Sequence, residues 1–206
     1  MPNGVGQEKD GKQQRVSLFN RYWGRFNAVH FGIPGDMTQN VIYRLEQGTL
    51  DGLSPKLVIL LIGTNNGSDG VAYSLQDTAN GIAAVVKVIR ERSPKSKVLL
   101  MGVFPRGTAP EGLKKIKDLN AILATLDDGK TVRFMDIGDK LAPNGVPTRD
   151  IQPDLLHLNW RGYDIWAQAI QPVVLETFGR PMSEALPPLY MPVAPPTNEP
   201  TSQPSK

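Results

Sequence analysis

The sequence predicts an α/β fold in which a parallel β-sheet is covered on both faces by helices. Between residues 27 and 172, short runs rich in β-branched and aromatic residues alternate with longer segments whose apolar residues recur every three or four positions. Two of the runs, 56–63 and 97–104, are almost entirely apolar, as expected for strands buried on both faces. A length of 206 residues favours one domain around this sheet.

Strands and helices are predicted in alternating order. The strands are residues 27–33, 56–63, 97–104 and 132–137, and the helices are residues 38–47, 73–92, 113–126 and 160–178. The helix at 73–92 carries one apolar stripe, and Pro94 is expected to stop it. Asn159 is the expected N-cap of the last helix.

The predicted domain lies between two segments of different composition. Residues 1–18 form a polar N-terminal segment, residues 19–180 the α/β domain, and residues 181–206 a proline-rich tail that we expect to be disordered. Seven prolines fall within residues 187–206. The polar N-terminus resembles no export signal, so the sequence leaves the cellular location undetermined.

Composition excludes several classes of function. The net charge is only +3 and the basic residues are dispersed, so a nucleic-acid partner is not expected. The absence of cysteine excludes a disulfide framework, a thiolate nucleophile and a cysteine-ligated metal. The longest apolar run, residues 57–62, is too short for a membrane span.

Three short motifs follow predicted strands, at the sheet edge where open α/β folds place their active sites. In GIPGD, residues 32–36, a glycine before a helix can turn its backbone N–H toward an anion. In IGTNN, residues 62–66, an asparagine amide can stabilise a developing oxyanion. The third motif pairs Asp154 with His157, so that the carboxylate can fix the imidazole tautomer while the other ring nitrogen accepts a proton.

Each motif taken singly also has a purely structural interpretation. A tight strand-to-helix turn requires glycine for backbone reasons, and asparagine and glycine are common turn formers. An aspartate three residues before a histidine also arises by chance. The other histidine, His30, falls within a predicted strand and is interpreted as structural.

Together, in this order, the motifs resemble the conserved blocks of the SGNH, or GDSL, hydrolase family. The stretch NAVHFGIPGDMTQNVIYRLEQGTLDGLSPKLVILLIGTNN, residues 27–66, is especially similar to the branch containing the platelet-activating-factor acetylhydrolase catalytic subunits and related bacterial esterases. FPRG at 104–107, DIGDK at 136–140 and DLLHLNWRGYDIWAQAI at 154–170 continue a resemblance that spans residues 19–174. It implies a three-layer α/β/α fold with a flavodoxin-like parallel sheet, and no metal or organic cofactor.

Carried over residue by residue, the resemblance assigns four residues of the site. Gly35 becomes the glycine whose backbone N–H helps to form the oxyanion hole, and Asn65 donates a side-chain N–H to the same oxygen. His157 becomes the general base and Asp154 its orienting partner. The implied substrate is a small ester, such as an acetylated sugar or lipid, and relatives in this branch can form homodimers.

The nucleophile of the family is missing from this sequence. In the family it is a serine in a Gly-Asp-Ser motif after the first strand, and none of the nine serines here has that setting. Ser17 falls in the segment that resembles the one after the first block. Ser68, in NNGSDG, is the only serine beside a motif of the site, but its neighbours do not match the nucleophile block.

The missing block also affects the predicted sheet. In the flavodoxin-like strand order 2-1-3-4-5 the first strand lies inside the sheet, so its loss would leave two apolar strands unpaired. We therefore expect Met1 to be an internal methionine of an incomplete sequence, in which case a signal peptide could also be missing.

The leading hypothesis is an ester hydrolase of the serine type whose first block lies outside this sequence. A catalytically inactive binding or interaction module on the same scaffold is the alternative, because the serine is missing. A flavodoxin-like nucleotide binder is disfavoured, because the sequence has no glycine-rich phosphate loop.

Overall fold

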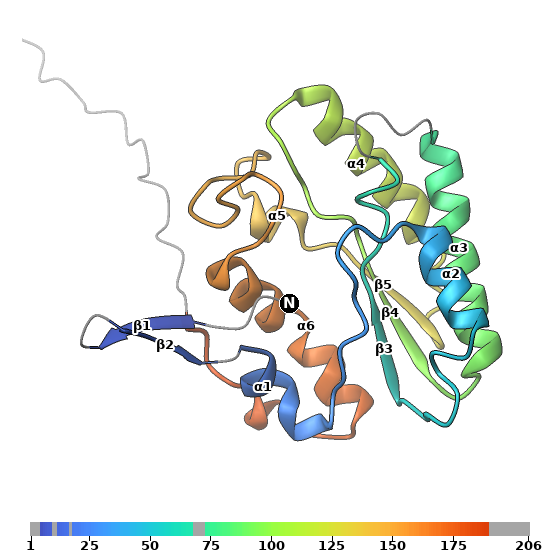
Figure 1. Cartoon of the computed structure of the whole chain (residues 1–206), viewed down its shortest axis with the longest axis horizontal. Helices are drawn as coiled ribbons and strands as arrows, with labels where there is room; N and C mark the ends of the chain where they lie inside the picture. Colours follow the sequence, from blue (N-terminus) through green and yellow to red (C-terminus); the bar gives the residue numbers. More distant parts are fainter. Residues whose placement is uncertain (1–4, 10–11, 17, 68–72, 190–206) are drawn as a thin grey trace, which may run out of the picture.

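The computed structural model describes residues 5–9, 12–16, 18–67 and 73–189. A three-stranded parallel sheet lies between two layers of helices (Figure 1). Its strands, in the order β3-β4-β5, are β3 (Leu57–Leu60), β4 (Lys97–Met101) and β5 (Val132–Met135). Three of the four predicted strands are therefore confirmed, and so is the three-layer α/β/α arrangement.

Helices cover both faces of this sheet (Figure 1). One face carries α2 (Thr38–Glu46), α3 (Leu75–Arg92) and α4 (Pro110–Ala124), and the other α1 (Leu18–Trp23), α5 (Gly138–Leu141) and α6 (Trp160–Thr177). Alternate side chains of β4 point to opposite faces: Val98 and Leu100 join the core with α3, whereas Leu99 and Met101 join the core with α6. No helix in the described part of the chain combines the length and apolarity needed to cross a membrane.

Local sequence signals set the ends of the long helices. Ser74 accepts a hydrogen bond from the Asp77 backbone N–H at 3.0 Å and caps α3, which ends two residues before Pro94 as predicted. Asn159 caps α6 by accepting bonds from the backbone N–H groups of Arg161 and Gly162. The apolar stripe of α3 is buried as predicted, at Ala79, Ile82, Val85, Val86 and Ile89.

The strand predicted at residues 27–33 does not form. This segment is an irregular connection between the 3₁₀ helix η1 (Gly24–Phe26) and α2, beyond the β3 side of the sheet (Figure 1). A β-strand needs a neighbour to satisfy its backbone groups, and no described residue pairs with this segment as a strand. The apolar side chains of Val29, Phe31 and Ile33 consequently remain exposed.

Both terminal segments contain elements that the sequence did not predict. Within the polar segment 1–18, β1 (Val5–Lys9) and β2 (Lys12–Val16) form an antiparallel pair. In the segment predicted as a disordered tail, residues 181–189 instead include a second 3₁₀ helix, η2 (Met182–Glu184), and contact α6. The remainder of that segment, 190–206, lies outside the described residues.

Buried polar side chains of α6 hold this C-terminal stretch. Gln171 accepts a hydrogen bond from the Leu186 backbone N–H at 2.7 Å and donates to the Leu186 carbonyl at 3.1 Å. The fully buried Asp164 accepts from the Leu189 N–H at 2.8 Å and from the Tyr22 hydroxyl at 2.5 Å. Composition could not reveal these bonds, because the side chains that make them come from distant parts of the chain.

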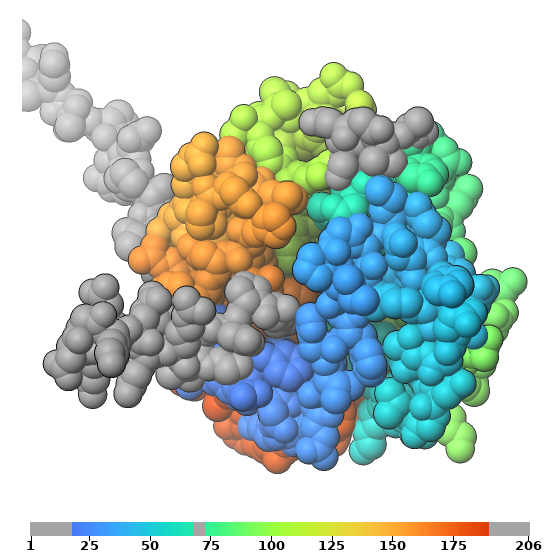
Figure 2. Space-filling view, viewed as in Figure 1, coloured from blue at the N-terminus to red at the C-terminus, as the bar shows by residue number. Residues whose placement is uncertain are grey.

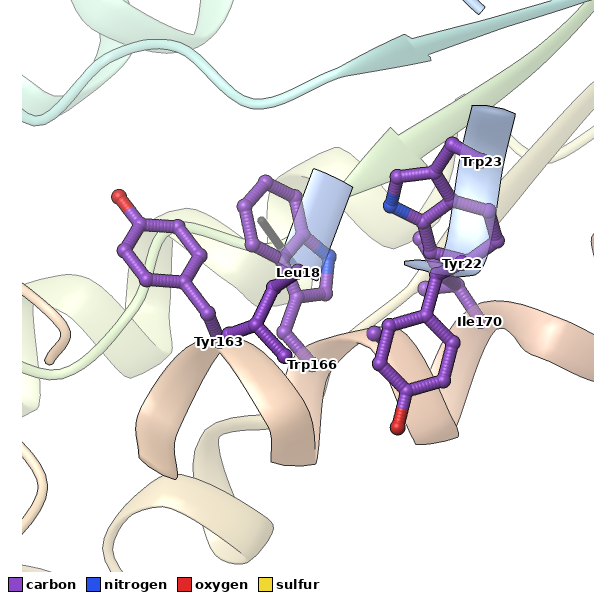
Figure 3. Close-up of a pocket in the computed structure, with 7 residues that line it drawn as sticks. Leu18, Tyr22, Trp23, Tyr163, Trp166 and Ile170 are labelled. Atoms are coloured by element: carbon purple, nitrogen blue, oxygen red, sulfur yellow. The ribbon is translucent and has the colours of Figure 1, made fainter. Parts of the chain in front are cut away.

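Aromatic residues fill the space between α1 and α6. Tyr22 and Trp23 of α1 lie opposite Tyr163 and Trp166 of α6, around a cavity of only about 10 Å³ (Figure 3). A space of that size holds at most one water molecule. This contact therefore belongs to the core and joins the N-terminal helix to the last one.

We expect Tyr22→Phe to lower the free energy of unfolding by about 1–3 kcal/mol, because the buried Asp164 carboxylate loses a hydrogen-bond donor. Burial, and then the bond to Asp164, raises the pKa of Tyr22 from 10.0 to about 12. The neutral phenol therefore stabilises the fold fully below pH 10, and this contribution is lost as the pH rises through 12.

Urea denaturation at neutral pH and between pH 9 and about 12 measures both effects. Tyr43→Phe, on the exposed surface of α2, is the matched control and should stay within about 0.5 kcal/mol of the wild type. Equal losses in the two variants would show that the Tyr22 bond contributes nothing.

Candidate active site

His157 and Asp154 form a hydrogen-bonded pair in the turn that precedes α6. The Nδ1 atom of His157 lies 2.6 Å from Asp154 Oδ2, and both side chains are largely exposed. The other carboxylate oxygen accepts the backbone N–H groups of His157 at 2.7 Å and Leu156 at 3.0 Å. These bonds, led by that from the His157 ring, hold the pKa of Asp154 well below its usual range. An ionised Asp154 favours a proton on Nδ1, which leaves Nε2 as the free base.

The backbone of this turn adopts a conformation that an isolated chain would avoid. Leu155 has a φ of 61°, in the left-handed region that is costly for residues other than glycine. Its N–H donates to the Gln152 carbonyl and its own carbonyl accepts the Gly107 N–H, both at 2.8 Å. Tertiary bonds therefore hold the conformation that places Asp154 beside the His157 ring.

The structure also brings together the two residues predicted for an oxyanion hole. Gly35 has a φ of 84°, which explains the requirement for glycine in the GIPGD turn. The side-chain amide of Asn65, which follows β3, donates to the carbonyl of Asp36 at 2.9 Å, directly after Gly35. An amide carries two N–H donors, so this bond leaves one of them for another acceptor.

Buried and charged side chains fix the position of this turn. Asn66, almost fully buried, accepts the Thr38 backbone N–H at 3.0 Å and donates to the Thr38 hydroxyl at 3.1 Å, which ties the end of β3 to the start of α2. Arg44 of α2 pairs with the Asp36 carboxylate and donates to the Phe31 carbonyl. The GIPGD turn is therefore anchored both to α2 and to the loop that carries Asn65.

The loop after β4 is bonded both to the loop that carries Asn65 and to the turn that carries His157. Arg106 donates to the carbonyl of Gly67, beyond Asn65 and Asn66, and the next residue, Gly107, bonds to the His157 turn. Figure 2 shows a hollow between two surfaces of the molecule. The orange surface belongs to the region of the turn before α6, and the blue surface belongs to the segment that precedes α2. The predicted base and the predicted oxyanion residues thus lie on loops that share one neighbour.

Sequence reasoning assigned no role to three buried amides at this edge of the sheet: Asn66, Asn120 and Gln152. Asn120 of α4 bonds to both backbone groups of Val103 and to the Asp136 carboxylate, all at 2.8–3.0 Å. Such residues carry no distinctive signal, because polar side chains are normally expected at the surface. Only their burial identifies them.

No described serine bonds to His157. Ser74 caps α3, and Ser93 and Ser96 bond to each other at 2.7 Å where α3 ends, close to the start of β3 and so at the opposite edge of the sheet. Ser17 and Ser68 lie outside the described residues. Within the described residues, no group of three or more His, Cys, Asp or Glu side chains is placed to hold a metal ion.

A cavity lined by the described residues also lies away from this site. It has a volume of about 290 Å³ and lies at the amino end of the sheet, between the strands and the end of α6. Its lining contains none of the four predicted site residues. The chemistry proposed from sequence therefore belongs to the exposed loops at the other edge.

Several known proteins are similar to this chain. The family model of the GDSL-like Lipase/Acylhydrolase family matches residues 2–165. Platelet-activating factor acetylhydrolase IB subunit alpha1 from Homo sapiens is 30% identical over 186 residues, which cover 89% of this chain and 79% of that protein.

Two solved structures share the fold. A GDSL-like lipase from Bacteroides thetaiotaomicron VPI-5482 has a TM-score of 0.66 at 23% sequence identity. The match covers 77% of this chain and 80% of the lipase chain. A carbohydrate acetylesterase from Sinorhizobium meliloti has a TM-score of 0.57 at 20% identity, with coverage of 84% and 93%. At these identities the likeness is one of fold.

We expect His157→Ala to raise the pKa of the Asp154 carboxyl, because the largest cause of its low value is the bond from the His157 ring. The value should stay below the usual range, since the backbone N–H groups of residues 156 and 157 still donate. Carbon-13 NMR titration of the carboxyl measures this. Asp77, whose pKa is lowered by Ser74, is an internal control that should not move. An unchanged Asp154 titration would contradict the hydrogen-bonded pair.

Proposed function

Because the chain belongs to the GDSL-like lipase/acylhydrolase family, we propose that it is an ester hydrolase that uses a Ser-His-Asp mechanism. The observation that carries this proposal is the 2.6 Å contact between Asp154 and His157, in a turn bonded to the same loop as the segment that holds Asn65. Neither residue is needed for the core, since both side chains are largely exposed.

In this proposal His157 is the general base. Its Nε2 atom takes the proton of a serine hydroxyl as the serine oxygen attacks the ester carbonyl, and Asp154 stabilises the imidazolium that forms. The imidazolium then donates the proton to the departing alcohol. Water, activated by the same ring, attacks the acyl-serine and releases the acid, which restores the serine.

Asn65 and Gly35 are proposed to stabilise the tetrahedral intermediates. The second N–H of the Asn65 amide and the backbone N–H of Gly35 are the donors for the oxyanion. Their placement is supported by the anchoring of both loops through Asn66 and Arg44, which reduces the reorganisation needed when charge develops. Preorganised donors of this kind are the main source of transition-state stabilisation in acyl transfer.

We further propose that the serine lies on a β-strand of the complete protein that is absent from these 206 residues and fills the open side of β3. Three observations support this. Only β4 pairs with β3 among the described residues, Ile59 in the middle of β3 is 38% exposed, and Val29, Phe31 and Ile33 expose apolar side chains at alternate positions. Parallel sheets are normally buried on both faces, so these groups favour a further strand that would cover them.

The names of the relatives suggest the class of substrate. One related protein is named an acetylhydrolase and one of similar fold a carbohydrate acetylesterase. We propose that the substrate carries a short acyl ester, with acetyl as the first candidate, on a lipid or a sugar. An exposed His157 is compatible with a bulky alcohol portion that remains outside the protein.

The alternative is a catalytically inactive binding module on the same scaffold. The absence of a matching serine from the sequence motivates it. The two proposals differ in one property, because only the enzyme possesses a serine that an adjacent base activates.

We expect the endogenous protein to react with a fluorophosphonate probe at a serine upstream of these 206 residues, because the probe labels activated serines. Its intact mass should exceed that of the 206-residue chain. His157→Ala in the same protein should abolish labelling and most ester hydrolysis, since the base is lost. An endogenous chain of 206 residues that remains unlabelled would favour the inactive module.

We expect Asn65→Ala in the serine-containing protein to lower kcat for acetyl ester hydrolysis by about 10²–10³, because one oxyanion donor is removed. KM should change little if the amide acts mainly in the transition state. Asn80→Ala, on the exposed surface of α3, is the control and should retain full activity. Steady-state kinetics with melting temperatures separates lost catalysis from lost folding. An unchanged kcat would leave Asn65 with a purely structural role.

A further inference from the structure

Gln152 is a fully buried glutamine, 0% exposed, to which neither the family resemblance nor the proposed mechanism assigns a role. It lies two residues before Asp154, at the start of the turn that carries His157. Its side-chain amide donates to two backbone carbonyls, those of Pro105 and Leu156, each at 3.0 Å. One carbonyl belongs to the loop after β4 and the other to the His157 turn, so a single side chain joins the two segments.

Among the described residues, the oxygen end of the Gln152 side chain has no hydrogen-bond partner, whereas both of its N–H groups have one. This difference indicates that the position requires the two donors. An amide oxygen buried without a partner loses its hydrogen bonds to water and gains none in return, which destabilises the fold. The fold tolerates that cost while both N–H donors serve carbonyls on either side of the site.

A second bond acts in parallel with Gln152. The Gly107 N–H donates to the Leu155 carbonyl at 2.8 Å, so residues 105 and 107 each hold one side of the turn. Between them Leu155 is kept at a positive φ, which an unrestrained leucine would leave for a lower-energy conformation. Release of either attachment would let the turn relax and would move the Asp154 carboxylate relative to the His157 ring.

We propose that Gln152 is a positioning residue that holds the Asp154–His157 pair in its reactive geometry by tying this turn to the loop after β4. The inference rests on the proposed function for its catalytic meaning. Its structural content, the dependence of the turn on one buried amide, can be tested without catalysis.

The test compares Gln152→Met with Gln171→Met. Methionine has nearly the same length and removes the amide, and Gln171 is also buried and bonded to backbone but lies on α6, where it holds the C-terminal segment. Two NMR readouts apply to the full chain: the carboxyl titration of Asp154, and hydrogen exchange of the Gly107 N–H. Urea denaturation of both variants shows whether their stabilities match.

In Gln152→Met we expect the pKa of Asp154 to rise toward its usual range and the Gly107 amide to exchange at least about tenfold faster, because the turn opens locally. Gln171→Met should leave both readouts as in the wild type. If Gln152→Met does not fold, Gln152→Asn replaces it, since the shortened amide cannot reach both carbonyls. Unchanged readouts in the Gln152 variants, or equal changes in Gln171→Met, would overturn the proposal.

The catalytic consequence is measured separately in the serine-containing protein. There Gln152→Met should lower kcat for acetyl ester hydrolysis by about 10- to 100-fold with little change in KM, as misplacement of a base by about 1 Å does. Altered NMR readouts in a protein that hydrolyses no ester would contradict the proposed function and leave the positioning role intact. Altered readouts with wild-type kcat would overturn the catalytic part of this inference.

Discussion

At the carboxyl end of a parallel sheet, each strand leaves backbone groups that no neighbouring strand can satisfy, and the loops there need other partners. In this protein three buried side-chain amides supply them. Asn66 joins the end of β3 to the start of α2, Asn120 joins the ends of β4 and β5, and Gln152 joins the loop after β4 to the turn before α6. The candidate active site depends on these bonds, because its residues lie on the loops that the amides connect.

In the candidate site the side chains that support the loops are buried, whereas the side chains predicted to carry the chemistry are exposed. The amides that hold the loops are hidden from water, where an unmatched polar group is costly and their bonds are therefore difficult to break. The side chains of His157 and Asp154 are exposed, as groups that must meet a substrate have to be. Asp154 combines both roles, since it orients the imidazole and accepts two backbone N–H groups of its own turn.

The open side of β3 follows from the same backbone requirement. Among the described residues β3 has one neighbour, which leaves half of its backbone ladder unpaired, and the segment 27–33 beside it has the composition of a strand without forming one. Val29, Phe31, Ile33 and Ile59 are among the large apolar residues that remain exposed. The strand that we propose for the complete protein would supply both the serine and a second neighbour for β3.

The sequence by itself determined the α/β class, three of the strands, the four long helices and the cap at Asn159, because periodicity and capping are local properties. Through the family resemblance it also predicted four site residues, whose roles remain proposals. Tertiary structure decided three other features. It left residues 27–33 unpaired, since pairing requires a partner elsewhere in the chain, and it held residues 181–189 against α6 through Asp164 and Gln171. It also buried Gln152, which no local pattern distinguishes from a surface glutamine, because burial depends on segments that are distant in sequence.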